Sequence, residues 1–151
     1  MIERYSRSAM KKIWADSNKF QIWLDIEILA CEAHQKMGLI PAADLQQIKS
    51  KAKFDLARIL EIEKVTKHDV IAFLTAVAEH VGPSSRFIHM GLTSSDIGDT
   101  ALSVQMVQAA DILIADAEKL AGIFRRKAGQ YRKTVMMGRS HGVHAEPTTF
   151  G

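Results

Sequence analysis

An uninterrupted stripe of apolar side chains over residues 102–131 constrains the fold of this chain more than any other feature. Its members recur every three or four residues: Leu102, Met106, Ala109, Leu113, Ala117, Leu120, Phe124, Ala128 and Tyr131. This spacing predicts one helix from about Ser95 to Lys133, a rod of roughly 55 to 60 Å. A single stripe of this length can be buried only against other long helices, so we expect a bundle within one chain or between subunits.

The segment before this stripe is also expected to be helical. Apolar residues at helical spacing predict a helix over residues 17–37, and Gly38 with Pro41 marks its end. Three shorter helices are predicted over residues 41–52, 55–65 and 69–81. No segment alternates in the manner of a strand. We therefore predict an all-α fold with a small helical amino-terminal domain, residues 1–93. This domain leads into the first long helix of a central bundle, residues 94–151.

The pattern changes after Thr134, where the chain is expected to form a partly extended loop. Gly138 and Gly142 interrupt it, and Pro147 biases Glu146 away from helix. A long amphipathic helix followed only by a polar loop lacks the other helices against which it would pack. We therefore expect this chain to be the amino-terminal part of a longer protein.

Composition excludes several classes of protein. The 151 residues are 47% hydrophobic and 25% charged, which is typical of a folded domain rather than a disordered chain. The longest apolar runs are far shorter than the roughly 18 residues that a membrane-spanning helix needs. The start lacks the pattern of a secretion signal, and the solitary Cys31 cannot close an intrachain disulfide. We expect a cytoplasmic protein.

The formal charge of +3 does not indicate a nucleic-acid partner. Much of the excess comes from basic residues near the end of the predicted long helix, where the macrodipole favours cations. These residues are Arg125, Arg126, Lys127, Arg132 and Lys133. They lack the interleaved aromatic residues of a surface that stacks single-stranded bases, so we expect no nucleic acid to bind.

The run Thr93-Ser94-Ser95-Asp96 is the first candidate site. It offers three hydroxyls and free backbone amides at the start of the long helix, which suits a carboxylate or a phosphate. The alternative is an ordinary helix cap, and taken alone the run favours that interpretation.

A second candidate is the glycine-bearing loop that holds Arg139, Ser140, His141 and His144. Imidazole can give or take a proton near neutrality, and arginine can hold a carboxylate with two hydrogen bonds. No Cys pair or second His pair completes a metal site at recognisable spacing, so we expect no metal. A structural loop remains an equal alternative from residue types alone.

Further candidates lie at the ends of predicted elements. His68 and Asp69 begin a predicted helix, and His89 lies just before the Thr93 run. Such junctions often display binding groups, although a single junction histidine is more often a cap or a surface residue. Arg4 and Tyr5 could hold a phosphate, and the alternative for them is a loosely ordered terminus.

Together these segments resemble the adenylosuccinate lyases, a branch of the fumarase and aspartase superfamily. The resemblance covers the whole chain and is carried by residues 1–6, 60–63, 67–70, 89–96 and 138–151, the last of which read GRSHGVHAEPTTFG. It implies an all-helical homotetramer without a metal or organic cofactor. It also implies elimination of fumarate from adenylosuccinate, giving AMP, and from the succinyl-carboxamide ribonucleotide (SAICAR), giving AICAR.

The resemblance also implies roles for individual residues. His141 would be the general acid that protonates the departing nitrogen, and His68 would assist it beside the substrate. The catalytic serine and a lysine that steadies the intermediate would lie beyond Gly151, so the fragment alone is expected to be inactive. Substrate-binding roles are implied for Arg4, Tyr5, Lys67, Asp69, His89, Thr93, Ser94 and Ser140. The phosphate is assigned to Arg4, Tyr5 and His89, and the succinyl part to Thr93 and Ser94.

Two departures from the family pattern affect substrate contacts. Lys67 stands where arginine is usual, and Ser140 stands where threonine is common. Two alternatives remain. One is another lyase of the superfamily, acting on argininosuccinate, aspartate or malate, and Arg4-Tyr5 with residues 67–69 counts against it. The other is a noncatalytic helical assembly module.

Overall fold

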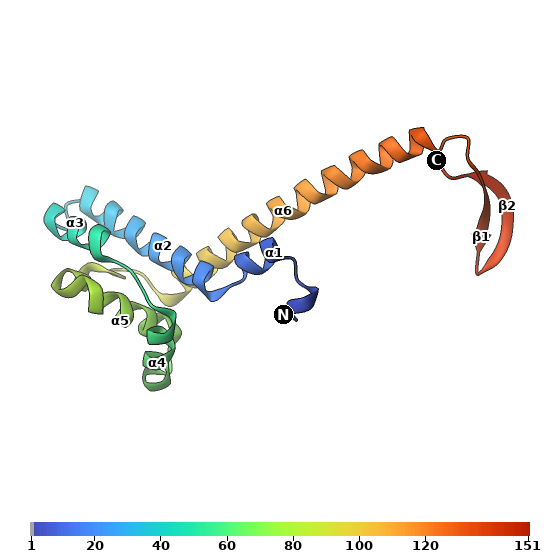
Figure 1. The fold of residues 1–151 in the computed structure, drawn as a ribbon. Coiled ribbons are helices and arrows are strands. Elements are labelled where there is room, and N and C mark those ends of the chain that lie inside the picture. Colours follow the sequence, from blue (N-terminus) through green and yellow to red (C-terminus); the bar gives the residue numbers. More distant parts are fainter. Residues whose placement is uncertain (1) are drawn as a thin grey trace. The chain divides into compact units, whose positions relative to one another are not determined.

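The computed structural model describes residues 2–151, and helices make up most of them (Figure 1). The elements are η1 (Glu3–Tyr5), α1 (Ser8–Ile13), α2 (Asp16–Lys36), α3 (Ala42–Lys51), α4 (Leu56–Thr66), α5 (Asp69–Val81), η2 (Gly82–Phe87), α6 (Ser94–Gln130), β1 (Val135–Ser140) and β2 (Val143–Thr149). The η elements are 3-10 helices. The predicted all-α fold class is confirmed. Within the described residues, every helix falls short of the length or the hydropathy that a membrane span requires.

The predicted helices agree with the observed ones to within a few residues because their ends carry local signals. The Asp55 carboxylate accepts a hydrogen bond from the Arg58 backbone N–H at 2.9 Å and caps α4. After α2, Gly38 takes a left-handed φ of +77°. The short α1 is not among the predicted helices, since six residues are too few to establish a helical period.

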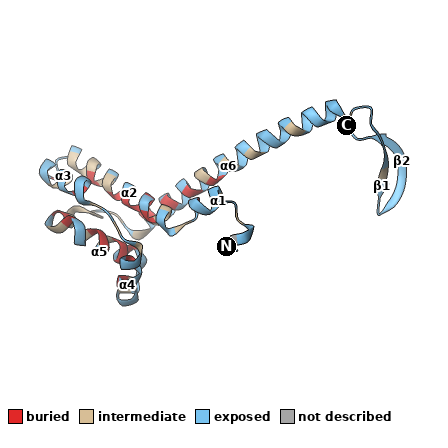
Figure 2. Cartoon of the chain, in the orientation of Figure 1, coloured by how far each residue is buried: buried red, intermediate tan, exposed pale blue. Residues whose placement is uncertain are grey.

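An aromatic cluster forms the centre of the core in the first compact unit, which extends to Ala109. Phe20 and Trp23 of α2 contact Phe73 of α5, and Phe54, from the loop between α3 and α4, completes the cluster. Ring centroids in contact lie between 5.1 and 6.1 Å apart. Figure 2 shows that buried residues gather along α2, α5 and the start of α6. This packing holds the segments on either side of α5, which carry residues 67–69 and 89–94.

Helix α6 contributes to both compact units, which divide between Ala109 and Ala110. Its buried side chains all belong to the first unit: Ile97, Ala101, Gln105 and Ala109. In the second unit several large apolar side chains of α6 are at least half exposed, namely Leu113, Ile114, Leu120 and Phe124. Their burial against other long helices stays a prediction, and so does the domain boundary at residues 93–94.

The second unit also contains a β-hairpin, where the sequence predicted a loop without strands. Strands β1 and β2 pair antiparallel from Val135 opposite Thr149 to Ser140 opposite Val143, with a bulge at Gly138. A Cβ atom on Gly138 would lie 2.9 Å from the Glu146 carbonyl oxygen, so the bulge needs glycine. Both strands are exposed on both faces. Their sequences therefore lack the alternation of apolar and polar residues that predicts a half-buried strand.

Candidate functional site

The predicted site residues lie at four places, three in the first unit and one in the second. Arg4 and Tyr5 are in η1, residues 67–69 join α4 to α5, and residues 89–94 lead from η2 into α6. Ser140 and His141 are at the tip of the hairpin. Residues 67–69 and 89–94 lie at junctions between elements, as the sequence predicted for His68 and His89. Arg4 and Tyr5 lie within η1, and Ser140 and His141 lie at a hairpin turn.

His89 makes the strongest polar contact of these residues, with Glu27 of α2. The His89 backbone N–H donates to Glu27 Oε2 at 2.8 Å, and His89 Nδ1 lies 2.7 Å from Glu27 Oε1. His89 has a left-handed φ of +67°, which is uncommon for a residue other than glycine. One carboxylate therefore holds both the backbone and the ring of His89.

Glu27 contacts a predicted site residue and was not itself singled out from the sequence. Its side chain is 1% exposed, and burial raises its pKa while the hydrogen bonds and charge of His89 act to lower it. A signal was present in the sequence. Glu27 lies on the buried stripe of α2, three residues after Leu24 and four before Cys31. A carboxylate at a core position needs a partner, and the sequence alone did not identify that partner.

The run before α6 forms a helix cap through Asp96. The Thr93 backbone N–H donates to Asp96 Oδ2 at 2.7 Å, and the Asp96 N–H donates to the Thr93 carbonyl at 3.0 Å. Thr93 is exposed, and Ser94 is half-buried beside it. The run therefore forms the helix cap that the sequence favoured. The hydroxyls of Thr93 and Ser94 also lie at a helix start, where the backbone amides favour anions.

The junction between α4 and α5 presents Lys67, His68 and Asp69 at the surface. Lys67 ends α4 with a φ of +53°, and His68 Nδ1 accepts from the Ile71 N–H at 3.4 Å. Asp69 Oδ1 accepts from the Val70 N–H at 2.8 Å. Since Nδ1 of His68 serves the cap, Nε2 is the ring nitrogen that can exchange a proton with a ligand.

A surface hollow of about 570 Å³ adjoins this junction. Lys67 lines it together with Leu60, Glu63 and Lys64. Lys67 therefore borders a space that can receive a small group.

His141 lies at the tip of the hairpin. It and Gly142 form the two-residue turn, with φ values of +53° and +76°, and Ser140 pairs with Val143 to close it. Left-handed angles at both turn residues are the signature of a type I′ turn. Arg139 lies opposite His144 in the same ladder. The turn displays the imidazole of His141 in solvent, where it can meet a substrate.

Arg4 and Tyr5 are exposed and contact each other. The Arg4 guanidinium carbon lies 4.8 Å from the centre of the Tyr5 ring, within cation–π range. The Ser6 hydroxyl donates to the Ile2 carbonyl at 3.0 Å and closes the turn that carries them. The pair therefore presents a cation and a phenol side by side.

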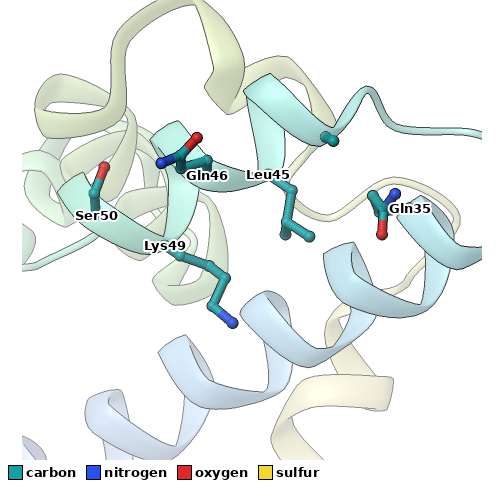
Figure 3. A pocket seen from close by; sticks show the side chains of 6 residues that line it. Gln35, Leu45, Gln46, Lys49 and Ser50 are labelled. Carbon is teal, nitrogen blue, oxygen red and sulfur yellow. The ribbon is translucent and has the colours of Figure 1, made fainter.

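A hollow of about 400 Å³ between α2 and α3 holds none of the predicted site residues (Figure 3). Its Lys49 ammonium is already paired with Glu32 at 2.6 Å. Within residues 2–151, no three His, Cys, Asp or Glu side chains gather as metal ligands would. We assign no site to this hollow.

Comparison with known proteins gives matches that cover nearly the whole chain or all of it. Residues 3–151 match the protein family described as Lyase. The whole chain is 56% identical to adenylosuccinate lyase of Bacillus subtilis and 57% identical to that of Synechocystis, covering 35% of each relative's length. The adenylosuccinate lyase of Staphylococcus saprophyticus is 53% identical over the same span. The resemblance inferred from the motifs is therefore confirmed.

Solved structures share the fold at lower identity. The 3-carboxy-cis,cis-muconate lactonizing enzyme of Pseudomonas putida matches 96% of this chain and 34% of its own, with a TM-score of 0.87 and 28% identity. A fumarate lyase from Mesorhizobium matches 97% of this chain and 36% of its own, with a TM-score of 0.84 and 23% identity. The family match over residues 3–151 establishes that this chain belongs to the lyase family.

Proposed function

We propose that this chain is the amino-terminal third of an adenylosuccinate lyase, a carbon–nitrogen lyase of purine biosynthesis. The observation that carries the proposal is the identity of 53–57% over all 151 residues to three proteins of that name. Two solved structures that share the fold and are named for other reactions are 25–28% identical, which favours the adenylosuccinate branch over other substrates. The chain spans about 35% of the relatives' length, so other segments must complete the active site.

The proposed reaction is the elimination of fumarate. A base outside these residues removes a proton from the succinyl carbon next to the carbon that bears nitrogen. The electron pair of that C–H bond is first held in an enolate-like intermediate, and it forms the new C=C bond when the C–N bond breaks. His141 donates its proton to the departing nitrogen, giving AMP from adenylosuccinate and AICAR from SAICAR. The exposed position of His141 on the hairpin turn supports this role.

The remaining junctions bind the substrate in this proposal. Arg4, Tyr5 and His89 hold the nucleotide phosphate, and Thr93 with Ser94 holds the succinyl carboxylates. The helix start at Ser94 supports the second assignment, because its amides and the helix dipole favour anions. Secondary contacts come from Lys67, Asp69 and Ser140, and His68 assists proton transfer.

We further propose that the full-length protein is a cytoplasmic homotetramer. The exposed apolar side chains of α6 beyond Ala109 support assembly, because contact with equivalent helices would remove them from water. The alternative of a noncatalytic assembly module predicts the same tetramer without fumarate release, so activity separates the two.

The test is ultraviolet-monitored cleavage of adenylosuccinate by a protein of the relatives' full length that contains this chain. His141→Asn is the informative variant, since asparagine tolerates the left-handed turn and carries no transferable proton. Its rate should fall on the order of a hundredfold or more. His144→Asn, three residues away on the same hairpin, is the matched control and should retain activity. An inert wild-type protein would refute the function, and a fully active His141→Asn would refute the mechanism.

A further inference from the structure

A buried carboxylate in the core of the first unit has no part in the chemistry described above. Glu27 is 1% exposed on α2, 62 residues before the His89 that it contacts. An unpaired charge in such a place is strongly unfavourable, so the pairing with His89 is what makes this carboxylate tolerable. The burial of Glu27 therefore indicates that its carboxylate has a role in addition to packing.

We propose that Glu27 is a positioning residue that fixes the backbone and the ring nitrogens of His89 for binding an anionic substrate group. This inference rests on the proposed function, in which His89 contacts the nucleotide phosphate. Oε2 of Glu27 accepts the His89 backbone N–H at 2.8 Å, and Oε1 lies 2.7 Å from Nδ1. Because a carboxylate can only accept, this contact places the ring hydrogen on Nδ1.

The segment before His89 is attached to α2 at a second point. The Cys31 thiol donates to the Phe87 carbonyl at a sulfur–oxygen distance of 3.7 Å. Cys31 follows Glu27 by four residues, so the two contacts come from successive turns of the same face of α2. Two anchors on one rigid helix hold the His89 backbone at φ +67°, a conformation that needs such support outside glycine.

The carboxylate also decides which ring nitrogen is left for a ligand. With Nδ1–H directed at Glu27, only Nε2 remains to face the substrate. The imidazolium form then donates Nε2–H to a phosphate oxygen while Nδ1–H stays on Glu27. This arrangement gives a charge-assisted contact whose direction is set before the substrate arrives.

Glu27→Gln tests the assignment because it keeps the shape and changes the donors. The glutamine Oε1 can still accept the His89 backbone N–H, but its amide then donates to Nδ1. Nδ1 of His89 should therefore lose its hydrogen, which leaves the neutral ring with hydrogen on Nε2 only. Long-range proton–nitrogen spectra of the full-length protein labelled with ¹⁵N-histidine report this directly, with the His89 signals assigned by their loss in His89→Asn.

Kinetics provide the second readout. For Glu27→Gln we expect KM for adenylosuccinate to rise about tenfold with kcat changed less than threefold, since a neutral donor replaces a charged one in ground-state binding. The matched control is Gln105→Met, which removes another buried polar contact, a 2.7 Å hydrogen bond to the Ile13 carbonyl. That control should keep the wild-type KM and the wild-type His89 spectrum.

The outcomes are separable. Retention of the Nδ1–H form in Glu27→Gln, or a KM equal to that of Gln105→Met, would overturn the positioning role. If wild-type protein releases no fumarate, the proposed function fails, and the His89 spectra alone decide the positioning role. Glu27→Asp, which keeps the charge, should restore most of the affinity if charge and direction are what matter.

Discussion

The ring of Phe73 in α5 stacks on the ring of Phe20 in α2, with centroids 5.6 Å apart and planes inclined by 13°. Trp23 meets the same Phe73 ring edge-on at 5.5 Å. Phe73 is fully buried and joins α2, which carries Glu27, to α5, which begins directly after His68, so the stability of the first unit depends on it.

We predict that Phe73→Ala lowers the stability of the first unit by about 3 to 5 kcal/mol, through lost burial and the cavity it leaves. Thermal unfolding of the full-length protein should show an earlier transition. Leu39→Ala is the control: its side chain is 56% exposed, and its change should stay within about 0.5 kcal/mol. Equal shifts for the two variants would contradict the assigned core.

The turn at His141 depends on glycine at its second position. Gly142 has a φ of +76°, so Gly142→Ala should cost about 1 to 2 kcal/mol and displace His141. We expect a fall in kcat together with faster proteolysis of the hairpin. Gly129→Ala is the control, because Gly129 lies in α6 with open space where a Cβ would be added. That change should be neutral or slightly stabilising. A Gly142→Ala enzyme with wild-type kcat would show that the turn geometry is irrelevant.

Lys67 offers a test by gain of function. Lys67→Arg replaces a point charge with a forked donor beside the hollow at the α4–α5 junction, so KM for adenylosuccinate should fall about two- to fivefold. Lys64→Arg, which lines the same hollow, should leave KM unchanged. If both variants behave alike, Lys67 has no specific contact with substrate.

We predict that the buried Cys31 thiol makes the folded state less stable at high pH. Burial, aided by the charge of Glu27, raises the pKa of the Cys31 thiol from 9.0 to about 11. Between those values the unfolded thiol has released its proton while the folded thiol keeps it. The folded state therefore binds more protons, and stability falls as pH rises.

Two pKa units correspond to a stability loss on the order of 2 kcal/mol between pH 9 and pH 11. Cys31→Ala lacks this thiol. Melting temperatures of wild type and Cys31→Ala at pH 8, 9.5 and 11 should therefore converge as pH rises. A constant difference between the two proteins across that range would rule out a raised thiol pKa.

Helix positions were predictable from sequence because their signals are local. Periodic apolar residues and end signals such as Asp55 and Gly38 act within a few residues, so α2 to α6 were located closely. The hairpin was not predicted, because its strands are exposed on both faces and His141-Gly142 is not the usual Asn-Gly turn signal.

The sequence by itself also determined the family and the junctions that carry candidate residues, since those motifs are contiguous runs such as residues 89–96 and 138–151. Only the tertiary structure decided the pairing of Glu27 with His89. Those residues are 62 positions apart, and no local pattern connects them. Their contact arises because packing places α2 beside the loop before α6, and a buried carboxylate must take the donors that this packing brings to it.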